Sequence, residues 1–330
     1  MKIGFIIIYY GKWPPYYELW ARSLRANPRF SFLVVTDLPA PDFVPDNLRI
    51  VSMSRAELEA RVTDLLGLPF KLRNFHKCCD LRPLYGLIFS DLVSDWKYWG
   101  YCDMDLVFGD LTPLYEAAER GTHMLISPWN FTAGHCTLVR NQTEANRAFF
   151  QMEGFRERMA SPDYAYCEEG AFAYLAAVTL RMSFLHTPDV RQEWLKPECF
   201  LGATFAPPCR LSGAEQWDDF AVLCEEGRTR VLDGAGHLHE VLYFHFMGAK
   251  SPQYWKRFQA PGAFPFSFLP HGYQPGLTSL AELRAPRTRM RSGLARARAQ
   301  AYMNLHRLTP PPVRRGLKRA LAKLRGISRT

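Results

Sequence analysis

Two aspartates separated by one residue interrupt an otherwise apolar segment of the chain. Asp103 and Asp105 follow Trp99-Gly100-Tyr101-Cys102 and precede Leu106-Val107-Phe108. If the segment is extended, alternate residues project to the same side, so the two carboxylates lie together. Two like charges in an apolar setting repel each other, unless one takes up a proton or a cation lies between them. The pattern indicates a divalent-ion site with oxygen ligands, and acids on a surface loop are the alternative.

A histidine lies in a second apolar segment, which runs from residue 241 to residue 247. His245 stands among aromatic residues, where it is either a hydrogen-bonded core residue or a ligand. Gly248 lets the backbone approach a bound molecule, and Lys250 offers a compact cation for a phosphate. A core residue is the commoner case for such a histidine, but the glycine and the lysine after the strand make a ligand site a comparable alternative.

A third group of charged residues surrounds the start of a predicted helix. Lys77, Asp80 and Arg82 fall within six residues. Asp80 is either a helix N-cap with solvated bases beside it, or it holds a sugar hydroxyl or an arginine while Lys77 or Arg82 reaches a phosphate.

The elements that must position these residues alternate between strand and helix. The continuous β-branched and aromatic run from Lys2 to Tyr10 predicts a central parallel strand. We expect further strands at 30–35, 48–51, 96–102, 123–127, 182–186 and 241–247. We expect helices at 16–26, 54–66 with a Ser54/Glu57 capping box, 80–94, 113–120, 144–159 and 170–180. The order predicts an α/β fold, a mostly parallel twisted sheet flanked by helices, with ligands near the strand C-termini.

The charge of the chain is unevenly distributed. Its 330 residues carry a formal net charge of +9, but residues 281–330 hold 14 Lys or Arg and one acid. We therefore expect a domain over 1–280 and a basic helical tail over 281–330, with an amphipathic helix near its end. The tail either docks on an anionic membrane surface or is a solvated extension. Nucleic-acid binding is not expected, because aromatic residues hardly interleave with the basic ones.

Several other classes of protein are disfavoured. No apolar window reaches the ~18 residues of a membrane-spanning helix, and the N-terminal apolar run is interpreted as a strand and not as a signal peptide. The eight cysteines form no C-x-x-C pair, which favours free core cysteines in a reducing cytosol. A cytoplasmic protein is therefore predicted, and the tail adds the alternative of a peripheral protein on the inner face of the membrane.

Taken together, these segments resemble a bacterial family of GT-A-type glycosyltransferases linked to surface and capsular polysaccharide synthesis. The likeness covers about residues 1–255 and follows, in order, Tyr9-Tyr10-Gly11-Lys12, Val34-Val35-Thr36-Asp37, Lys77-x-x-Asp80-x-Arg82-Pro83, Trp99 to Asp105 and Gly134 to Asn141. The ending after His245 is similar to that of glycogenin-type retaining enzymes, with Lys250 one residue early. Glu168-Glu169 stands where the family tends to show an Asp-Glu pair.

The resemblance implies a GT-A fold and the transfer of a sugar from a UDP-sugar to a polysaccharide or lipid-linked glycan acceptor, with retention of configuration. It implies Mn²⁺ or Mg²⁺ at Asp103, Asp105 and His245. The resemblance also implies the remaining roles. The base and ribose would be held by Tyr10, Thr36 and Asp37, and the diphosphate by Lys77, Gly248 and Lys250. The sugar would be oriented by Asp80 and Arg82, and the acceptor hydroxyl would lie near Glu168, Glu169 and His135.

Rival functions are judged by the motifs they need. A two-metal phosphatase or nuclease needs more clustered carboxylates and histidines than this chain offers. A nicotinamide enzyme needs G-x-G-x-x-G after the first strand, where this chain has Gly11-Lys12-Trp13-Pro14. The remaining alternative is a non-catalytic sugar- or nucleotide-binding module of the same fold.

Overall fold

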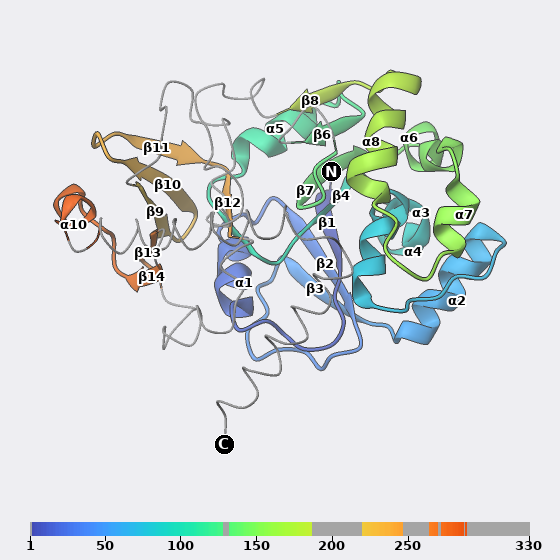
Figure 1. Cartoon of the computed structure of the whole chain (residues 1–330), viewed down its shortest axis with the longest axis horizontal. Helices are drawn as coiled ribbons and strands as arrows, with labels where there is room; N and C mark the ends of the chain where they lie inside the picture. The colour runs from blue at the N-terminus through green and yellow to red at the C-terminus, as the bar shows by residue number, and fades with distance from the viewer. Residues whose placement is uncertain are drawn as a thin grey trace, which may run out of the picture.

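A mixed sheet flanked by helices forms the centre of the molecule, and a second, antiparallel sheet lies beside it (Figure 1). The computed structural model describes residues 2–127, 132–186, 220–246, 264–269, 272–286 and 288. No helix in these ranges combines the length and the apolar character needed to cross a membrane.

The central sheet has seven strands in the order β3-β2-β1-β4-β7-β6-β8, and β7 alone runs against the others. The strands are β1 (Lys2–Ile8), β2 (Ser31–Thr36), β3 (Leu48–Ser52), β4 (Trp96–Cys102), β6 (Leu125–Ser127), β7 (Cys136–Arg140) and β8 (Phe184–His186). The expected mostly parallel sheet with β1 at its centre is confirmed. The carboxyl ends of β1, β2 and β4 meet the amino end of β7 at one edge, so residues distant in sequence converge there.

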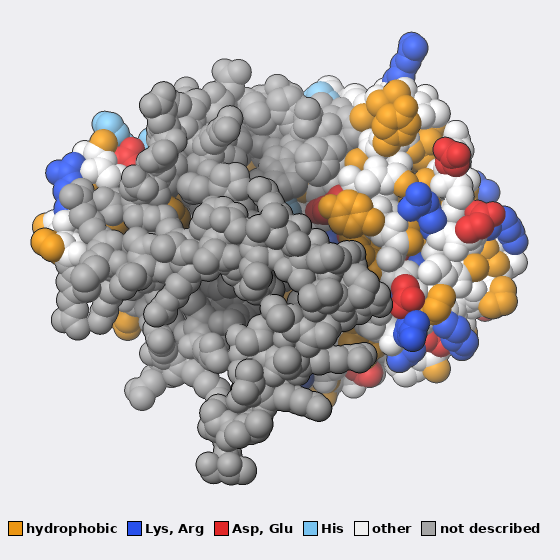
Figure 2. Space-filling view, in the orientation of Figure 1, with side chains coloured by type: hydrophobic (Ala, Val, Ile, Leu, Met, Phe, Trp, Pro, Cys, Tyr) orange, Lys and Arg blue, Asp and Glu red, His pale blue; other side chains and the backbone are white. Residues whose placement is uncertain are grey.

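Each face of this sheet is covered because alternate strand residues point to opposite sides. Phe5 and Phe32 pack on one face with α1 (Tyr17–Arg25) and α5 (Thr112–Arg120). On the other face, Ile6 and Leu33 meet the remaining helices of residues 55–179. These are α2 (Arg55–Leu66), η1 (Phe75–Leu84), α3 (Tyr85–Ile88), α4 (Ser90–Val93), α6 (Thr143–Arg147), η2 (Ala148–Gln151), α7 (Phe155–Ala160), η3 (Cys167–Ala171), α8 (Phe172–Tyr174) and η4 (Leu175–Thr179). Their outer side mixes both charges with apolar side chains (Figure 2).

The helix predictions hold where local signals are strong. The capping box of α2 is present, with Ser54 and Glu57 bonding each other's backbone N–H. Three expected continuous helices are instead broken: 80–94 lies in η1, α3 and α4, 144–159 is interrupted at Gly154, and 170–180 joins an α-helical turn to π-helical turns. Pro83 within η1 and the left-handed Gly154 account for two of the breaks. The described cysteines are free and five of the six are buried, as expected.

A five-stranded antiparallel sheet was not predicted at all from residues 195–280. Its order is β11-β10-β9-β13-β14, formed by β9 (Phe220–Glu225), β10 (Arg228–Asp233), β11 (Leu238–Val241), β13 (Phe266–Leu269) and β14 (Gly272–Pro275). Phe220, Val222 and Phe268 join the core of the central sheet. The single strand expected at 241–247 is two strands, β11 and β12 (Tyr243–His245), which turn at Leu242. Residue 247 lies outside the described residues.

Most of the predicted basic tail lies outside the described residues. The part that is described includes α10 (Leu280–Arg284), which begins with a capping box between Ser279 and Glu282. Leu283 is buried in a small core with Leu232 and Leu269. The packed body therefore continues past residue 280, where the sequence analysis placed the start of the tail.

Asn27 connects α1 to the chain that follows β5 (Leu106–Phe108). Its side-chain amide donates to the carbonyls of Ser23 and Gly109, and its oxygen accepts from the N–H of Leu111 at 2.9 Å. Asn27 is 6% exposed, so these backbone groups have little access to water. The contact holds the strand that begins directly after the paired aspartates.

The Asn27→Ala variant should lose about 2 kcal/mol or more of unfolding free energy, because buried donors and acceptors lose their partner. Urea unfolding of the two proteins measures the loss. The matched control is Asn74→Ala, since Asn74 is exposed and makes no side-chain capping bond. Its stability should change by less than about 0.5 kcal/mol. Equal losses in both variants would contradict the role given to Asn27.

Candidate metal centre

Asp103, Asp105 and His245 lie together in the folded chain. The two aspartates occupy the turn between β4 and β5, and the histidine ends β12. His245 Nε2 is 3.2 Å from Asp105 Oδ2 and 3.8 Å from Asp103 Oδ2. One ligand atom from each residue falls within 4.8 Å of the other two. Residues 140 positions apart thus form one group of oxygen and nitrogen donors that can hold a metal ion.

The convergence follows from the pairing of two short strands. β12 runs antiparallel to β5, with His245 opposite Leu106, and the N–H of Phe246 donates to the carbonyl of Asp105 at 3.0 Å. The N–H of Asp103 donates to the carbonyl of His135, which precedes β7. Backbone hydrogen bonds on both sides therefore fix the turn that carries the two carboxylates.

Burial makes the group electrostatically demanding. Asp105 and His245 are 2% and 3% exposed, while the side chain of Asp103 keeps 24% of its surface. Burial raises the pKa of the nearby Tyr16, and the negative charge of Asp105 raises it further. Two carboxylates in such a place are stabilised by a positive charge between them, and a divalent cation supplies that charge.

Arg82 supplies a positive charge at the rim of the group. Its Nη2 donates to Asp103 Oδ1 at 2.5 Å, and its Nη1 lies 3.7 Å from Glu168 Oε1. The guanidinium also lies 5.8 Å from the centre of the Tyr101 ring. Arg82 thus joins a candidate metal ligand to a second acid.

Glu168 is a buried carboxyl with an unusual protonation equilibrium. Its side chain is 2% exposed, and its Oε1 accepts a hydrogen bond from Tyr164 at 3.1 Å. Its Oε2 is also buried and accepts no hydrogen bond from the described residues. Burial raises the pKa of Glu168 to about 7, against the opposing effect of Arg82. The protonated form of this carboxyl is therefore stabilised far above the pH range of an ordinary glutamate.

The two other residues expected near an acceptor have different surroundings. Glu169 Oε1 accepts a hydrogen bond from the N–H of Gly134 at 2.7 Å. A side chain in place of Gly134 would not fit, because its Cβ would lie 2.6 Å from Arg82 Nη1. His135 stacks on His245 at 4.5 Å between ring centres, and its Nε2 lies 3.1 Å from the Tyr243 hydroxyl. His135 is 3% exposed, so it supports the ring of His245 from behind and presents little surface to an acceptor.

Lys77 and Asp80 form a buried ion pair. Both side chains are fully buried, and Lys77 Nζ donates to Asp80 Oδ2 at 3.0 Å and to the carbonyl of Arg158 at 2.7 Å. The carboxylate of Asp80 also accepts from the N–H groups of Ala165 and Cys167. Asp80 lies inside η1 and not at its N-cap, which corrects the expectation of a cap. The other expected roles, with Lys77 or Arg82 at a phosphate and Asp80 at a sugar hydroxyl or an arginine, remain predictions, but here Lys77 and Asp80 bind each other. The pair holds the segment that carries Glu168.

The residues expected to hold a base and ribose lie at the strand ends. Tyr10 stacks on Phe75 at 5.6 Å, and burial raises its pKa. Thr36 is buried and accepts from the N–H of Leu38, whereas Asp37 is exposed. Gly248 and Lys250, expected at the diphosphate, lie outside the described residues.

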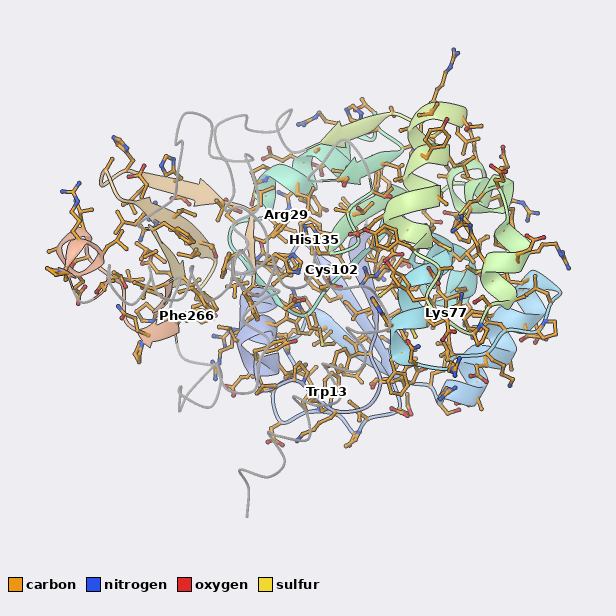
Figure 3. All side chains as sticks on the ribbon, in the orientation of Figure 1. Trp13, Arg29, Lys77, Cys102, His135 and Phe266 are labelled. Atoms are coloured by element: carbon orange, nitrogen blue, oxygen red, sulfur yellow. The ribbon has the colours of Figure 1, made fainter. Side chains whose placement is uncertain are left out.

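A pocket of about 310 Å³ opens above the two aspartates. Its lining comes from three parts of the chain: residues 6–10 and 16, then Phe75, Cys78, Cys79, Arg82 and Tyr85, and residues 102–105. Figure 3 labels Cys102 and His135 at this edge of the sheet, and Lys77 among the helices to the right. Sequence reasoning missed Phe75 and Tyr16 as parts of this pocket. Phe75 is 44% exposed, a value that only the fold reveals.

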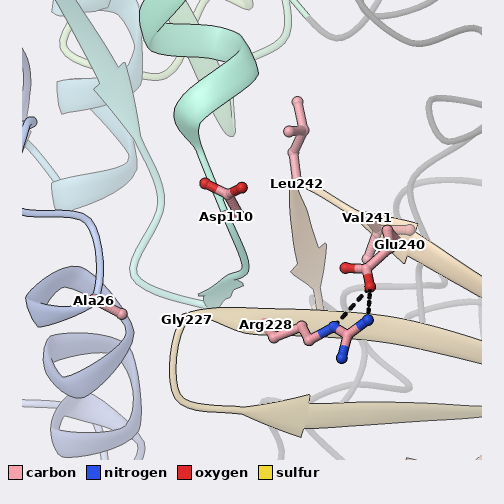
Figure 4. Close-up of a pocket in the computed structure, with 7 residues that line it drawn as sticks. All are labelled: Ala26, Asp110, Gly227, Arg228, Glu240, Val241 and Leu242. Atoms are coloured by element: carbon pink, nitrogen blue, oxygen red, sulfur yellow. Dashed lines mark hydrogen bonds and ion pairs between the residues drawn. The ribbon is translucent and has the colours of Figure 1, made fainter.

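A second pocket, of about 570 Å³, lies between α1 and the second sheet (Figure 4). Arg228 and Glu240 form an ion pair on its wall, and Asp110 faces it from the chain after β5. None of the residues predicted for the site lines it, so the two pockets are separate features.

The model of a family of unknown function, DUF6625, matches residues 5–259. The chain belongs to this family. No curated protein matches it. The matched range of this DUF6625 protein includes the paired aspartates, Arg82, Glu168 and His245, but the family description assigns them no activity.

The buried pair in the DUF6625 protein can be tested by stability. Lys77→Met leaves Asp80 charged and buried, so a loss of about 3–5 kcal/mol is expected in urea unfolding. The matched control is Lys71→Met, because Lys71 pairs with Glu59 while 74% exposed. That variant should lose less than about 1 kcal/mol. A Lys77→Met protein as stable as the control would return Lys77 to the set of candidate phosphate ligands.

Glu168 gives a prediction for pH. Since its folded pKa lies above the ordinary value of 4.5, its contribution to stability is present below pH 4.5 and is lost as pH rises through about 7. Glu168→Gln stays neutral, so its unfolding free energy relative to the parent protein should rise between pH 5 and 8 by on the order of 3 kcal/mol.

Urea unfolding after removal of metal with a chelator measures this difference. Glu153→Gln is the control, because Glu153 is exposed on the same stretch of chain. A difference for Glu168→Gln that stays flat with pH would show that the carboxyl is ionised throughout.

Proposed function

We propose that this protein is a metal-dependent glycosyltransferase of the GT-A fold, which moves a sugar from a UDP-sugar to a polysaccharide or lipid-linked glycan acceptor with retention of configuration. The observation that carries the proposal is the meeting of Asp103, Asp105 and His245, with His245 Nε2 at 3.2 Å from Asp105 and 3.8 Å from Asp103. Their place beside a pocket at the carboxyl ends of parallel strands supports it, because ligands of α/β sheets bind there.

The donor set fits the proposed cofactor. The group offers two carboxylates and one imidazole, and one ligand atom from each lies within 4.8 Å of the others. This donor set suits Mn²⁺, and Mg²⁺ is the alternative, as a harder ion that prefers oxygen ligands. A bound ion of this kind supplies a Lewis acid that stabilises negative charge on a leaving diphosphate. The partial exposure of Asp103 leaves one side of the group open to the pocket.

The protein's own residues have distinct tasks in this proposal. Arg82 orients Asp103 through the 2.5 Å contact and keeps a positive charge beside the phosphate-binding side of the pocket. Glu168 has a pKa near 7. When ionised it can accept a hydrogen bond or a proton from a sugar hydroxyl, and when protonated it can donate a hydrogen bond or a proton to it. Phe75 and Tyr10 form an aromatic wall on which a nucleobase can stack.

The alternative is a binding module of the same fold that holds a sugar or a nucleotide without turnover. Both functions need the metal group and the pocket, so binding alone does not separate them. Release of UDP does, because only a transferase breaks the glycosidic bond to the diphosphate.

The test begins with a thermal-shift screen of nucleotide sugars with and without Mn²⁺. We expect at least one UDP-sugar to raise the melting temperature only when Mn²⁺ is present. Asp105→Asn should abolish this shift, and Asp64→Asn, which changes an exposed aspartate of α2, should retain it. If no nucleotide sugar acts together with the metal, the proposal fails.

Slow release of UDP from the stabilising donor then separates enzyme from binding module. The rate should depend on Mn²⁺ and fall by at least about 100-fold in Asp105→Asn, as expected when charge stabilisation at the reacting centre is lost. If the protein binds the UDP-sugar but releases no UDP even when candidate glycan acceptors are present, the result would favour the non-catalytic binding module.

A further inference from the structure

The hairpin between β10 and β11 brings together three residues that can bind a metal. Asp233 ends β10, His237 closes the turn, and His239 lies two residues further on, in β11. We propose that they form a second metal site, separate from the first, which takes a divalent d-block ion such as Zn²⁺. This proposal does not depend on the glycosyltransferase function.

The register of the hairpin places the three side chains on one face. His239 lies opposite Val231, and alternate residues of a strand share a side, so Asp233, His237 and His239 all project in the same direction. Figure 2 shows histidine and acidic side chains gathered at the surface over this end of the molecule. One ligand atom from each falls within 4.8 Å of the other two.

Both imidazoles converge on a single carboxylate oxygen. His237 Nδ1 lies 3.1 Å and His239 Nε2 3.0 Å from Asp233 Oδ2. Ligand atoms that are each about 2.1 Å from a tetrahedral Zn²⁺ ion stand about 3.4 Å apart. The two nitrogens lie a few tenths of an ångström closer to the oxygen than this, so a small rotation of each ring would let one ion replace the hydrogen bonds.

The carboxylate is held in place by the turn. Asp233 Oδ1 accepts hydrogen bonds from the N–H groups of Ala235, Gly236 and His237 at 2.8–2.9 Å, which directs Oδ2 toward the rings. Because the backbone holds one oxygen, the other faces the two imidazoles, whose hydrogen bonds to it a bound ion would replace.

A neighbouring helix braces the turn. Arg284 of α10 donates to the carbonyl of Gly234 at 2.7 Å and 3.0 Å, and Leu283 packs in the core that includes Leu232. Because the turn is already held by these contacts, little conformational entropy is lost when it binds an ion, and this favours a higher affinity for the ion.

The donor set distinguishes this group from the first. Two imidazoles and one carboxylate suit Zn²⁺, Ni²⁺ or Cu²⁺, whereas two carboxylates and one imidazole also accept the harder Mn²⁺ and Mg²⁺. The His237 side chain is 72% exposed and that of Asp233 18%, so an ion can enter from solvent. Three protein ligands leave further positions for water.

The experiment measures Zn²⁺ uptake by the full chain after chelator treatment, by equilibrium dialysis in excess Mg²⁺. An Asp105→Asn background removes the first group, and we expect about one equivalent of Zn²⁺ to remain there. Adding His239→Gln or His237→Gln should weaken this uptake by more than about tenfold. His76→Gln is the matched control, since His76 is exposed and stacks on Tyr164.

Two further readouts decide the outcome. X-ray absorption of the Zn²⁺-loaded protein should give two imidazoles in the first shell, and the metal-free variants should melt at the temperature of the parent protein. Uptake unchanged in His237→Gln and His239→Gln, or lost equally in His76→Gln, overturns the proposal and leaves a hydrogen-bonded turn only. Uptake that disappears with Asp105→Asn alone overturns it in favour of the first group.

Discussion

Two carboxylates that are held side by side and largely buried require nearby positive charge, and much of the structure around Asp103 and Asp105 meets this need. Arg82 covers one side of the pair at 2.5 Å, and on the other side the ring of His245 offers a third ligand atom for a cation. The contact made by His245 does not survive a shift of the strands, because a slip of one residue between β5 and β12 turns His245 to the opposite face of the ribbon. The electrostatics of the site therefore depend on a short backbone register.

The same charges link the metal group to Glu168. Arg82 contacts Asp103 directly and lies 3.7 Å from Glu168, so any change in the charge on one acid alters the field at the other. This close approach needs Gly134, where a side chain would collide with both Arg82 and Glu169. The buried Lys77–Asp80 pair anchors the segment before Glu168 from below. The acid is thereby positioned by contacts from three separate parts of the chain.

The sequence predicted most reliably what neighbouring residues decide. Strand β1, the capping box at Ser54 and the strand ending at Cys102 follow from patterns within a few residues, and the structure has them. The second sheet was missed, because its alternation is weak and its stability comes from packing of Phe220 and Phe268 on the central core. The burial of Lys77 was equally invisible, since residue type and spacing do not reveal that a cation faces the carbonyl of Arg158.

The two candidate metal groups differ in how much of the fold each one requires. At the first, a ligand from β12 must meet a turn that precedes it by 140 residues, so the group exists only when the sheet and ribbon are assembled, and a bound ion favours the folded chain strongly. At the hairpin, all three ligands fall within seven residues, and the loop that an ion closes is short. Partial unfolding that separates β12 from β5 therefore destroys the first group and leaves the second intact. The first group thus reports on the assembly of the whole domain, whereas the second reports on one turn and the helix that braces it.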